Sequence, residues 1–508
     1  MQMQTDTKLD LLTKMLGASS AVAAALLEGG RKYGANFLSF VNETGSPYHS
    51  VLAVQQRLLA CGFSQLDERD KWDLRLGGKY FVTRNHSCIA AFVIGEKFKA
   101  TCGGFTVVAA HTDSPCLRLR PNSNVKKEGI QQVGVECYGG GMWHTWFDRG
   151  LGVAGKVVVK AQDGSLAEKL IRVDRPILVL PNLAIHLQSA EEISAFKINK
   201  ETHLQPVLCT EVYKQLLAAN DNTAREEKRT EEADKETEGN SSCSLLRKRK
   251  DERAAAPLLS LIAQELRVEN ADIVEWDLCL MDATPGRFCG VHEEFVESPR
   301  LDNLGSTWAA FSALMECPNP HPEEISMAVG FDHEEIGSES YTGAGSNVLM
   351  VWMERVAQAL SAAEFYPQIL SRSFLVSSDM AHGVHPNYAE RHQGQNKPQM
   401  QQGIVIKENA NQRYATNATS MALTRAVAEK GQVPMQMFTV KNDSRCGSTV
   451  GPILSARLGV RTIDIGIPQW AMHSCRETCG ILDLYALQLL LKEFFASFRS
   501  IDNSYEGV

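Results

Sequence analysis

The chain has 508 residues, of which 44% are hydrophobic, so it can bury a sizeable core and form more than one domain. Its formal net charge of −8 provides no basic field for nucleic acid, and no apolar run approaches the roughly 20 residues of a membrane-spanning helix. The 13 cysteines include no Cys-x-x-Cys motif, and an odd number at irregular spacing is not a disulfide framework. These features predict a large cytoplasmic protein with free thiols and no membrane partner.

The first apolar segment, residues 16–27 (LGASSAVAAALL), has the small and apolar composition of a signal-peptide core. Acidic Asp6 and Asp10 precede it, however, and no clear cleavage site follows. We therefore predict an alanine-rich helix here, and a targeting role of the N-terminus stays open.

Five short motifs along the chain carry residues that can bind metal ions. Four of them follow an apolar, β-prone run (FTVVAA, ISMAVGF, SFLVSS and VRTIDIGI) and stand where the run gives way to Gly, Ser, Pro or Asn. Residues at the open edge of an α/β sheet have this sequence context. The residues are His111 and Asp113, Asp302, Glu334 and Glu335, Asp379, and His473.

In the first motif, His111 and Asp113 are two residues apart. Residues i and i+2 of a strand share a face, so Asp113 can hold the imidazole of His111 in place. A lone His-x-Asp pair is common on protein surfaces, and the assignment depends on the presence of the other motifs.

Between this motif and Asp302 the sequence contains recurrent β-type runs, among them CLRLRP, KVVVKA and IRVDRPILVLP. These runs and the turns between them predict a β-rich domain inserted into an α/β domain. We expect the catalytic domain to comprise residues 1–115 and 269–508, and the inserted domain residues 116–268.

A charged insert occupies about residues 221–255 and includes REEKRTEEADKETE. Such a segment buries too little apolar surface to offset the entropy of ordering it, which predicts a disordered loop or a solvated helix. The RKRK at 247–250 is compatible with nuclear targeting, but a solubilising insert is the favoured interpretation.

The ligand types indicate the metal. Carboxylate and imidazole without thiolate suit zinc, manganese or cobalt, and two divalent ions need a carboxylate between them. Asp302 is the candidate bridge. An uncoordinated carboxylate must accept a proton from the attacking water, and one member of the Glu334/Glu335 pair can do so if the two side chains point in different directions. The histidines His382, His385 and His392 of the DMAHGVHPNYAERH stretch are expected to support the site rather than to bind metal.

HTDSP, SPRLDNL, DHEEIGSES, SSDMAHGVHPNY, KNDSRCGSTVGP and AMHSCRE, in this order, resemble the motifs of the M18 aminopeptidases, most closely the aspartyl aminopeptidases. The similarity extends from about Phe37 to the LYALQLLLKEFF segment near the end of the chain. It implies an α/β metallo-aminopeptidase domain with a mixed central sheet flanked by helices, and a β-rich dimerisation domain. It also implies a two-zinc centre that removes acidic residues (Asp, Glu) from peptide N-termini, and a tetrahedral dodecamer built from dimers.

Carried over to this sequence, the resemblance implies one metal ion on His111, Asp302 and Asp379. It implies a second on Asp302, Glu335 and His473, with Glu334 as the general base and Asp113 orienting His111. His186 in PNLAIHLQ matches a histidine that reaches into the partner subunit's active site. In VIKENANQRYA, Lys407 and Tyr414 match residues near the substrate's first side chain, where a lysine pairs with an acidic group.

Two alternatives stay open at this point. The same architecture serves metallopeptidases with other substrates, such as neutral N-termini, and the difference depends on the pocket rather than on the metals. A non-catalytic assembly protein that retains the fold is the other alternative, but it would be expected to lack a ligand or the base.

Overall fold

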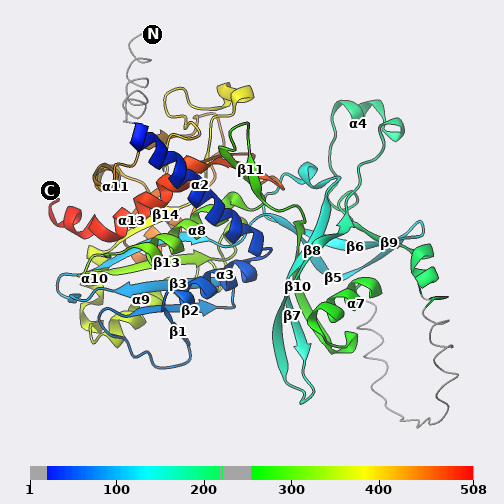
Figure 1. The fold of residues 1–508 in the computed structure, drawn as a ribbon, viewed down its shortest axis with the longest axis horizontal. Helices are drawn as coiled ribbons and strands as arrows, with labels where there is room; N and C mark the ends of the chain where they lie inside the picture. Colours follow the sequence, from blue (N-terminus) through cyan, green and yellow to red (C-terminus); the bar gives the residue numbers. More distant parts are fainter. Residues whose placement is uncertain (1–19, 218, 221–252, 507–508) are drawn as a thin grey trace. The chain divides into compact units, whose positions relative to one another are not determined.

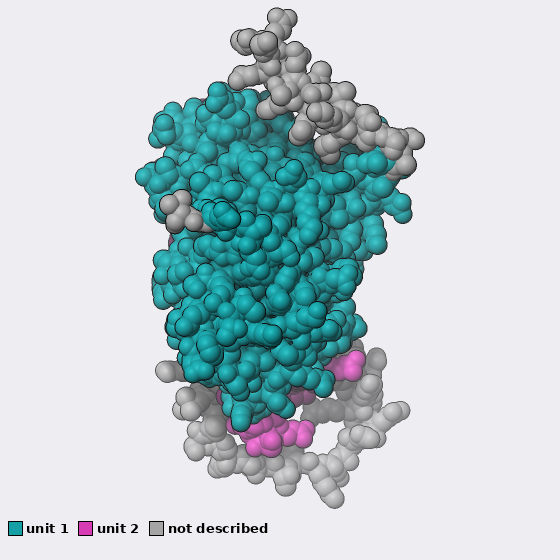
Figure 2. Space-filling view, turned by 90° about the vertical axis from the view of Figure 1, so that its left-hand side faces the viewer, with its two compact units in different colours: residues 1–114, 285–508 teal, residues 115–284 magenta. Residues whose placement is uncertain are grey.

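The structure is a computed structural model that describes residues 20–217, 219–220 and 253–506. The chain divides into two compact units, coloured separately in Figure 2: unit 1 comprises residues 1–114 and 285–508, and unit 2 residues 115–284. Most of the charged insert, residues 221–252, lies outside the described residues.

Unit 2 is built around a closed barrel with the strand order β10-β5-β6-β9-β8-β7. The strands are β5 (Cys116–Lys127), β6 (Ile130–Tyr138), β7 (Gly150–Lys160), β8 (Leu166–Val179), β9 (Val207–Thr210) and β10 (Ile273–Asp282). The helices of this unit include α4 (Ala190–Ser194) and α7 (Ala256–Leu266). Residues 269–284, which the sequence analysis assigned to the catalytic domain, contain β10. This ten-residue strand pairs along its length with β7, and no local sequence pattern shows such a pairing between distant segments.

Unit 1 contains a mixed sheet of nine strands in the order β1-β2-β3-β13-β4-β14-β18-β16-β17 (Figure 1). The strands are β1 (Ser64–Leu66), β2 (Lys79–Arg84), β3 (Cys88–Ile94), β4 (Phe105–His111), β13 (Ile325–Phe331), β14 (Phe374–Ser378), β16 (Ile404–Lys407), β17 (Met435–Phe438) and β18 (Arg461–Gly466). A smaller sheet has the order β11 (Arg287–Cys289), β12 (Phe295–Ser298), β20 (Glu477–Gly480), β19 (Pro468–Trp470) and β15 (Ala381–His382).

The central strands are mostly apolar because helices cover both faces of the large sheet. Every residue of β4 and β13 is buried, as expected for strands covered on two sides. Successive residues point to opposite faces, so that Val108 packs in one core, while Val107 and Ala109 pack in the other.

The two cores contain different helices. One face is covered by α2 (Ser20–Glu43), α3 (Pro47–Ala60), α8 (Leu301–Glu316), α11 (Ala418–Lys430) and α13 (Ile481–Asn503). The other face is covered by α9 (Val348–Ala359), α10 (Tyr366–Arg372) and α12 (Val450–Leu458). This arrangement, together with the β-rich unit 2, confirms the predicted α/β fold class.

Four strands of the large sheet run in the same direction and therefore end at the same edge. β4 pairs in parallel with β13 and with β14, and β14 pairs in parallel with β18. The metal-binding motifs follow the first three of these strands, so their side chains are brought to one edge of the sheet by strand direction alone.

At the N-terminus, the predicted helix over residues 16–27 falls partly outside the described residues. From Ser20 onward the chain is helical, as part of α2. Among the described residues, no helix is both long and apolar enough to cross a membrane.

Gly466, at the end of β18, provides a test of how tightly this edge is packed. A Cβ at this position would collide with the carbonyl oxygen of Asp379, so Gly466→Ala must displace the backbone next to a metal-binding motif. We expect a loss of about 1–3 kcal/mol in the free energy of unfolding, the usual range for overpacking, measured by denaturant unfolding. Gly394→Ala is the control, because a Cβ there meets no atom within 4 Å. Equal stability of both variants would contradict the tight packing.

Candidate metal centre

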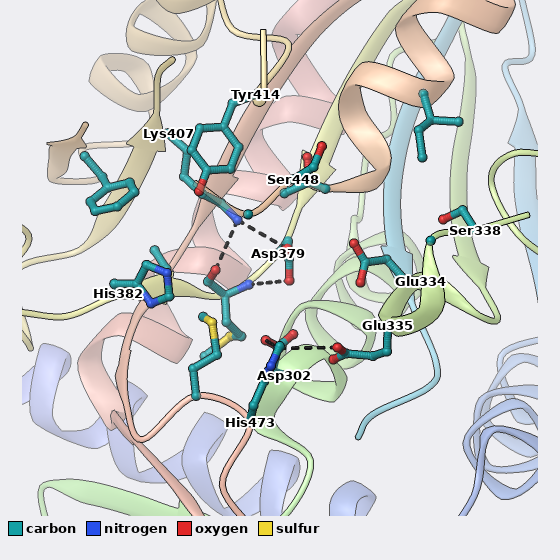
Figure 3. A pocket seen from close by; sticks show the side chains of 18 residues that line it. Asp302, Glu334, Glu335, Ser338, Asp379, His382, Lys407, Tyr414, Ser448 and His473 are labelled. Atoms are coloured by element: carbon teal, nitrogen blue, oxygen red, sulfur yellow. Dashed lines mark hydrogen bonds and ion pairs between the residues drawn. The ribbon is translucent and has the colours of Figure 1, made fainter. Parts of the chain in front are cut away.

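The predicted residues from all five motifs of unit 1 meet at the edge of the large sheet. Most of them line a pocket of about 430 Å³ (Figure 3). The walls include Asp302, Glu334, Glu335, Asp379 and His473. His111 and Asp113 are fully buried beneath them.

Asp302 lies between the two histidines of the site. Its Oδ1 is 3.4 Å from Nε2 of His111, and its Oδ2 is 3.5 Å from Nε2 of His473. Asp302 is in the first turn of α8, where its backbone departs from helical geometry. This departure aims the carboxylate out of the helix and between the two imidazoles, so that one oxygen faces each histidine.

Each histidine has a further carboxylate beside the same nitrogen. Nε2 of His111 is 3.6 Å from Oδ1 of Asp379, and Nε2 of His473 is 3.3 Å from Oε2 of Glu335. The site therefore consists of two groups that share Asp302. Glu334 stands next to the first group, with its Oε2 3.8 Å from Nε2 of His111.

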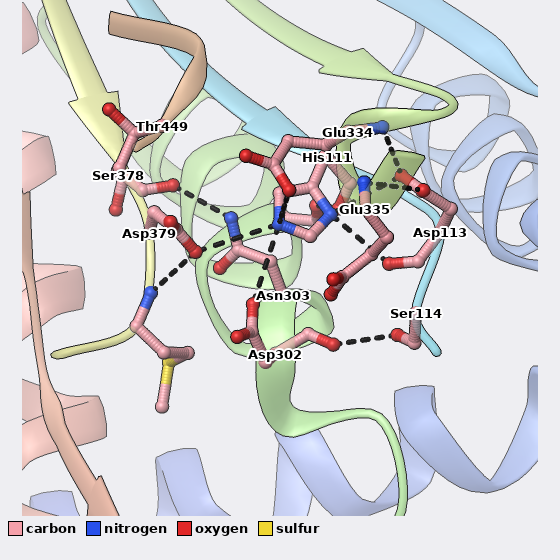
Figure 4. A network of polar contacts seen from close by, with 12 residues as sticks. His111, Asp113, Ser114, Asp302, Asn303, Glu334, Glu335, Ser378, Asp379 and Thr449 are labelled. Carbon is pink, nitrogen blue, oxygen red and sulfur yellow. Dashed lines mark hydrogen bonds and ion pairs between the residues drawn. The ribbon is translucent and has the colours of Figure 1, made fainter. Parts of the chain in front are cut away.

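Asp113 contacts three parts of the site (Figure 4). Its carboxylate accepts hydrogen bonds from the backbone N–H of Glu334 and of Glu335, both at 3.1 Å, and its Oδ1 is 3.4 Å from Nδ1 of His111. Nδ1 of His111 also lies 3.1 Å from the backbone carbonyl oxygen of Asp113. β4 ends at His111, so the two residues do not share a strand face. A turn after the strand brings them together instead.

Glu334 and Glu335 also differ in context from the expectation. β13 ends at Phe331, and the pair begins a short 3₁₀ turn, η4 (Glu334–Ile336). Their side chains diverge because of this turn rather than because of strand alternation. The bonds to Asp113 fix the turn at its first two residues.

Sequence reasoning missed Glu477. This buried residue of β20 accepts hydrogen bonds from the backbone N–H of Asp302 at 3.0 Å and of His473 at 2.7 Å. Its position in the AMHSCRE motif, four residues after His473, was visible, but nothing in the local pattern shows that a glutamate is buried. Only the pairing of β20 with β12 and β19 does so.

The electrostatics of the site are those of crowded carboxylates. Burial raises the pKa of Glu334 to about 8, and the neighbouring carboxylates Asp379 and Asp113 contribute in the same direction. Burial also raises the pKa of Glu335 well above its usual value, with Asp302 as the next cause. The carboxylates of the site are thus held together against their mutual repulsion, as expected where cations belong.

The pKa values of the His111 imidazole and the Asp302 carboxyl shift so as to favour the charged form of each group. Burial disfavours the charged form of His111, but the surrounding carboxylates outweigh it and raise its pKa well above the usual value. Burial likewise opposes ionisation of Asp302, yet His111 and His473 hold the pKa of this carboxyl well below its usual range. Asp302 is therefore held in its charged form.

The residues fit zinc. Two ligand atoms bound to a tetrahedral zinc ion at about 2.0–2.1 Å are roughly 3.4 Å apart, and the four nitrogen–oxygen distances around His111 and His473 are 3.3–3.6 Å. Oδ1 of Asp302 and Oε1 of Glu335 are buried without a hydrogen-bond partner. Buried oxygens normally have partners, and a metal ion would supply one.

The pocket wall opposite Glu334 contains Lys407 and Tyr414 (Figure 3). Nζ of Lys407 donates to the carbonyl oxygen of Met380 at 3.0 Å and lies 3.4 Å from Oδ2 of Asp379. It also lies 5.4 Å from the centre of the Tyr414 ring. Lys407 is 2% exposed. Because it lines the pocket and contacts Asp379, its charge lies beside both rather than in bulk solvent.

The other histidines named in the sequence analysis lie at different places in the structure. His382 lines the pocket beside Phe438. His385 and His392 each accept a hydrogen bond from the backbone, from Asn387 and from His385 respectively. His186 belongs to the 3₁₀ turn η2 (Ile185–Leu187) of unit 2 and is exposed there.

Known proteins resemble the chain over nearly its whole length. The family model for the aminopeptidase I zinc metalloproteases (M18) matches residues 40–495. Aspartyl aminopeptidase of Aspergillus oryzae is 45% identical over 486 residues, which cover 92% of this chain and 96% of the relative. The probable aspartyl aminopeptidase of Ricinus communis is 41% identical over 479 residues, with the same coverage.

Solved structures agree. A chain of the cryo-EM structure of the Ape4 and Nbr1 complex superposes with a TM-score of 0.84 at 41% identity, covering 93% of this chain and 87% of that chain. The mApe1 of Chaetomium thermophilum gives a TM-score of 0.80 at 31% identity, with coverages of 94% and 100%. With the match to the family model, these similarities show that the chain belongs to the M18 family of zinc metalloproteases.

Proposed function

We propose that this chain is a two-metal aminopeptidase that removes acidic residues (Asp, Glu) from peptide N-termini. The observation that carries the proposal is the position of Asp302, whose two oxygens face His111 and His473. Relatives at 41–45% identity are named aspartyl aminopeptidases, which supports the acidic specificity. The experiment is a turnover comparison of substrates with N-terminal Asp, Glu, Leu and Arg, with zinc, cobalt and manganese added in turn. Faster turnover of Leu or Arg substrates, or none with any metal, would contradict it.

In this proposal, His111, Asp302 and Asp379 hold one metal ion, and Asp302, Glu335 and His473 hold the other. Zinc is the expected metal, with cobalt and manganese as alternatives. Bound metal ions supply a water of lowered pKa and polarise the scissile carbonyl. Asp113 fixes the direction of His111 and the backbone of Glu334 and Glu335.

Glu334 is the proposed general base. It lines the pocket beside His111 and Asp379, in this proposal it binds neither metal ion, and Asp113 accepts a hydrogen bond from its backbone N–H. A carboxylate that accepts a proton from the attacking water and donates it to the departing amine must change protonation state near neutral pH. In the metal-free chain, burial and neighbouring carboxylates raise the pKa of Glu334 to about 8. Bound cations would lower this pKa again, so that the carboxylate can accept the proton of the water.

Bridging and terminal positions can be distinguished by metal content. Because Asp302 faces both histidines, Asp302→Ala should empty both sites, whereas His473→Ala should mainly empty one. Elemental analysis of the purified variants measures this directly. Two metal ions retained per chain in Asp302→Ala would show that Asp302 is not the bridge.

The role of Glu334 is tested by Glu334→Gln. The amide keeps the size of the side chain but cannot take up a proton, so turnover should fall by roughly 10²–10⁴-fold, the usual effect of losing a general base. Metal content should stay at the level of the unmodified protein. Near-normal turnover by a fully metallated variant would exclude Glu334 as the base.

Substrate choice is proposed to depend on Lys407 and Tyr414. The ammonium group has three N–H donors, and it lies among Asp379, the Met380 carbonyl and the Tyr414 ring. A donor directed into the pocket would pair with the acidic side chain of the substrate as a point charge. The contact with Asp379 gives Lys407 a second role, because it also holds a proposed metal ligand.

Lys407→Met separates the two roles. Loss of a charge-assisted contact costs about 1.5–3 kcal/mol, so kcat/KM for Asp and Glu substrates should fall roughly 10–100-fold more than for a Leu substrate. The comparison requires variants with full metal content, verified by elemental analysis. An equal loss on acidic and neutral substrates would mean that Lys407 acts only through Asp379.

Two further parts of the proposal concern assembly. We propose that unit 2 mediates dimerisation and that the dimers form a tetrahedral dodecamer. His186 is proposed to act in the active site of a neighbouring subunit, where an imidazole can stabilise the oxyanion of the tetrahedral intermediate. The assembly and the role of His186 follow from the family resemblance.

We also propose a cytoplasmic location, and the free thiols agree with it.

A further inference from the structure

Glu477 is a buried carboxylate whose oxygens face backbone N–H groups of the metal centre rather than its ligand atoms. It lies at the start of β20 and is 2% exposed. Its Oε2 accepts the backbone N–H of Asp302 at 3.0 Å, and its Oε1 accepts the backbone N–H of His473 at 2.7 Å. Nε2 of Gln469 lies 3.4 Å from the same Oε1.

The two N–H groups belong to segments that are far apart in the sequence. Asp302 is in the first turn of α8, and His473 is in the loop between β19 and β20. Glu477 thus holds the bridging candidate and the histidine of the second group at a fixed separation. The side chains of these two residues approach each other at 3.5 Å.

The backbone of His473 needs such a partner. Its φ of 66° lies in the left-handed region, which side chains with a Cβ rarely adopt. In this conformation of the loop the N–H of His473 donates to Oε1 of Glu477 at 2.7 Å. The hydrogen bond therefore stabilises the conformation in which Nε2 of His473 lies near Asp302 and Glu335.

We infer that Glu477 is a positioning residue of the metal centre, which sets the distance between Asp302 and His473 through their backbone N–H groups. The inference rests on the proposed two-metal site. Asp113 makes the same kind of contact, since its two oxygens accept the N–H groups of Glu334 and Glu335. One buried carboxylate thus orders each pair of metal-centre residues.

Two acceptor oxygens are necessary for this role, and that requirement suggests the test. An amide has one acceptor oxygen and an NH₂ group, so Glu477→Gln keeps the volume but turns a donor towards one of the two N–H groups. Either Asp302 or His473 then loses its partner. Substitutions behind metal ligands typically weaken metal binding about 10–100-fold.

Asp483 provides a matched control. It is also fully buried, and its two oxygens accept the backbone N–H of Gln401 at 2.7 Å and of Gly403 at 2.8 Å. Neither partner is a candidate metal-binding residue. Asp483→Asn therefore removes the same kind of interaction from the same unit while leaving Asp302 and His473 in place.

The experiment measures zinc affinity of the metal-free full-length protein by titration against a chromogenic chelator, with thermal unfolding followed in parallel. We expect Glu477→Gln to bind at least one zinc equivalent 10–100-fold more weakly than the unmodified protein, and Asp483→Asn to bind both as the unmodified protein does. Glu477→Asp, which retains two acceptors on a shorter side chain, should give an intermediate loss and serves if the glutamine variant does not fold.

The possible outcomes separate this inference from the proposed function. If the unmodified protein binds fewer than two zinc ions, the two-metal proposal fails. If it binds two, but the Glu477 variants bind them unchanged or lose no more affinity than Asp483→Asn, then Glu477 only stabilises the fold and the inference is wrong.

Discussion

The structure of unit 1 depends on one electrostatic constraint, the confinement of several carboxylates in a small buried volume. The carboxylates are Asp113, Asp302, Glu334, Glu335, Asp379 and Glu477. Like charges in a poorly solvated site repel strongly unless cations or protons offset them. Burial raises the pKa values of Glu334, Glu335 and Glu477, and the charges of neighbouring carboxylates raise them further. The imidazole of His111 and the ammonium group of Lys407 supply part of the counter-charge, and bound zinc, the metal of this metalloprotease family, would supply more.

A rigid scaffold is necessary to hold such a cluster. The parallel strands β4, β13 and β14 bring three of the motifs to one edge, and apolar cores on both faces fix each strand in register. The remaining residues come from outside these strands: Asp302 from α8, and His473 from the loop after β19. Their positions depend on hydrogen bonds rather than on strand direction, which is why Asp113 and Glu477, each accepting two N–H groups, are placed where the scaffold is least regular.

The sequence was informative where a local pattern determines the structure. Buried strands are mostly apolar, so FTVVAA and SMAVGF could be recognised and the charged residues after them assigned to a sheet edge. The insertion of a β-rich region was also visible. By contrast, the inclusion of β10 in the barrel of unit 2 and the burial of Glu477 arise from strand pairings between distant segments. No local pattern encodes these pairings. The contact between Lys407 and Asp379 is a further case, because a lysine in a sequence is expected to be solvated.

The same constraint links metal binding to folding. Metal ions that bind carboxylates and neutral imidazoles favour the deprotonated ligands and stabilise only the folded arrangement that brings them together. Without cations, burial favours the protonated forms of Glu334 and Glu335, and the histidines hold the charge of Asp302 instead. The folded chain therefore contains a site whose charges are balanced only in part by its own residues. In a catalytic pocket of this kind, the crowded carboxylates lower the stability of the metal-free fold. The same carboxylates give the folded chain its affinity for the ions that the reaction requires.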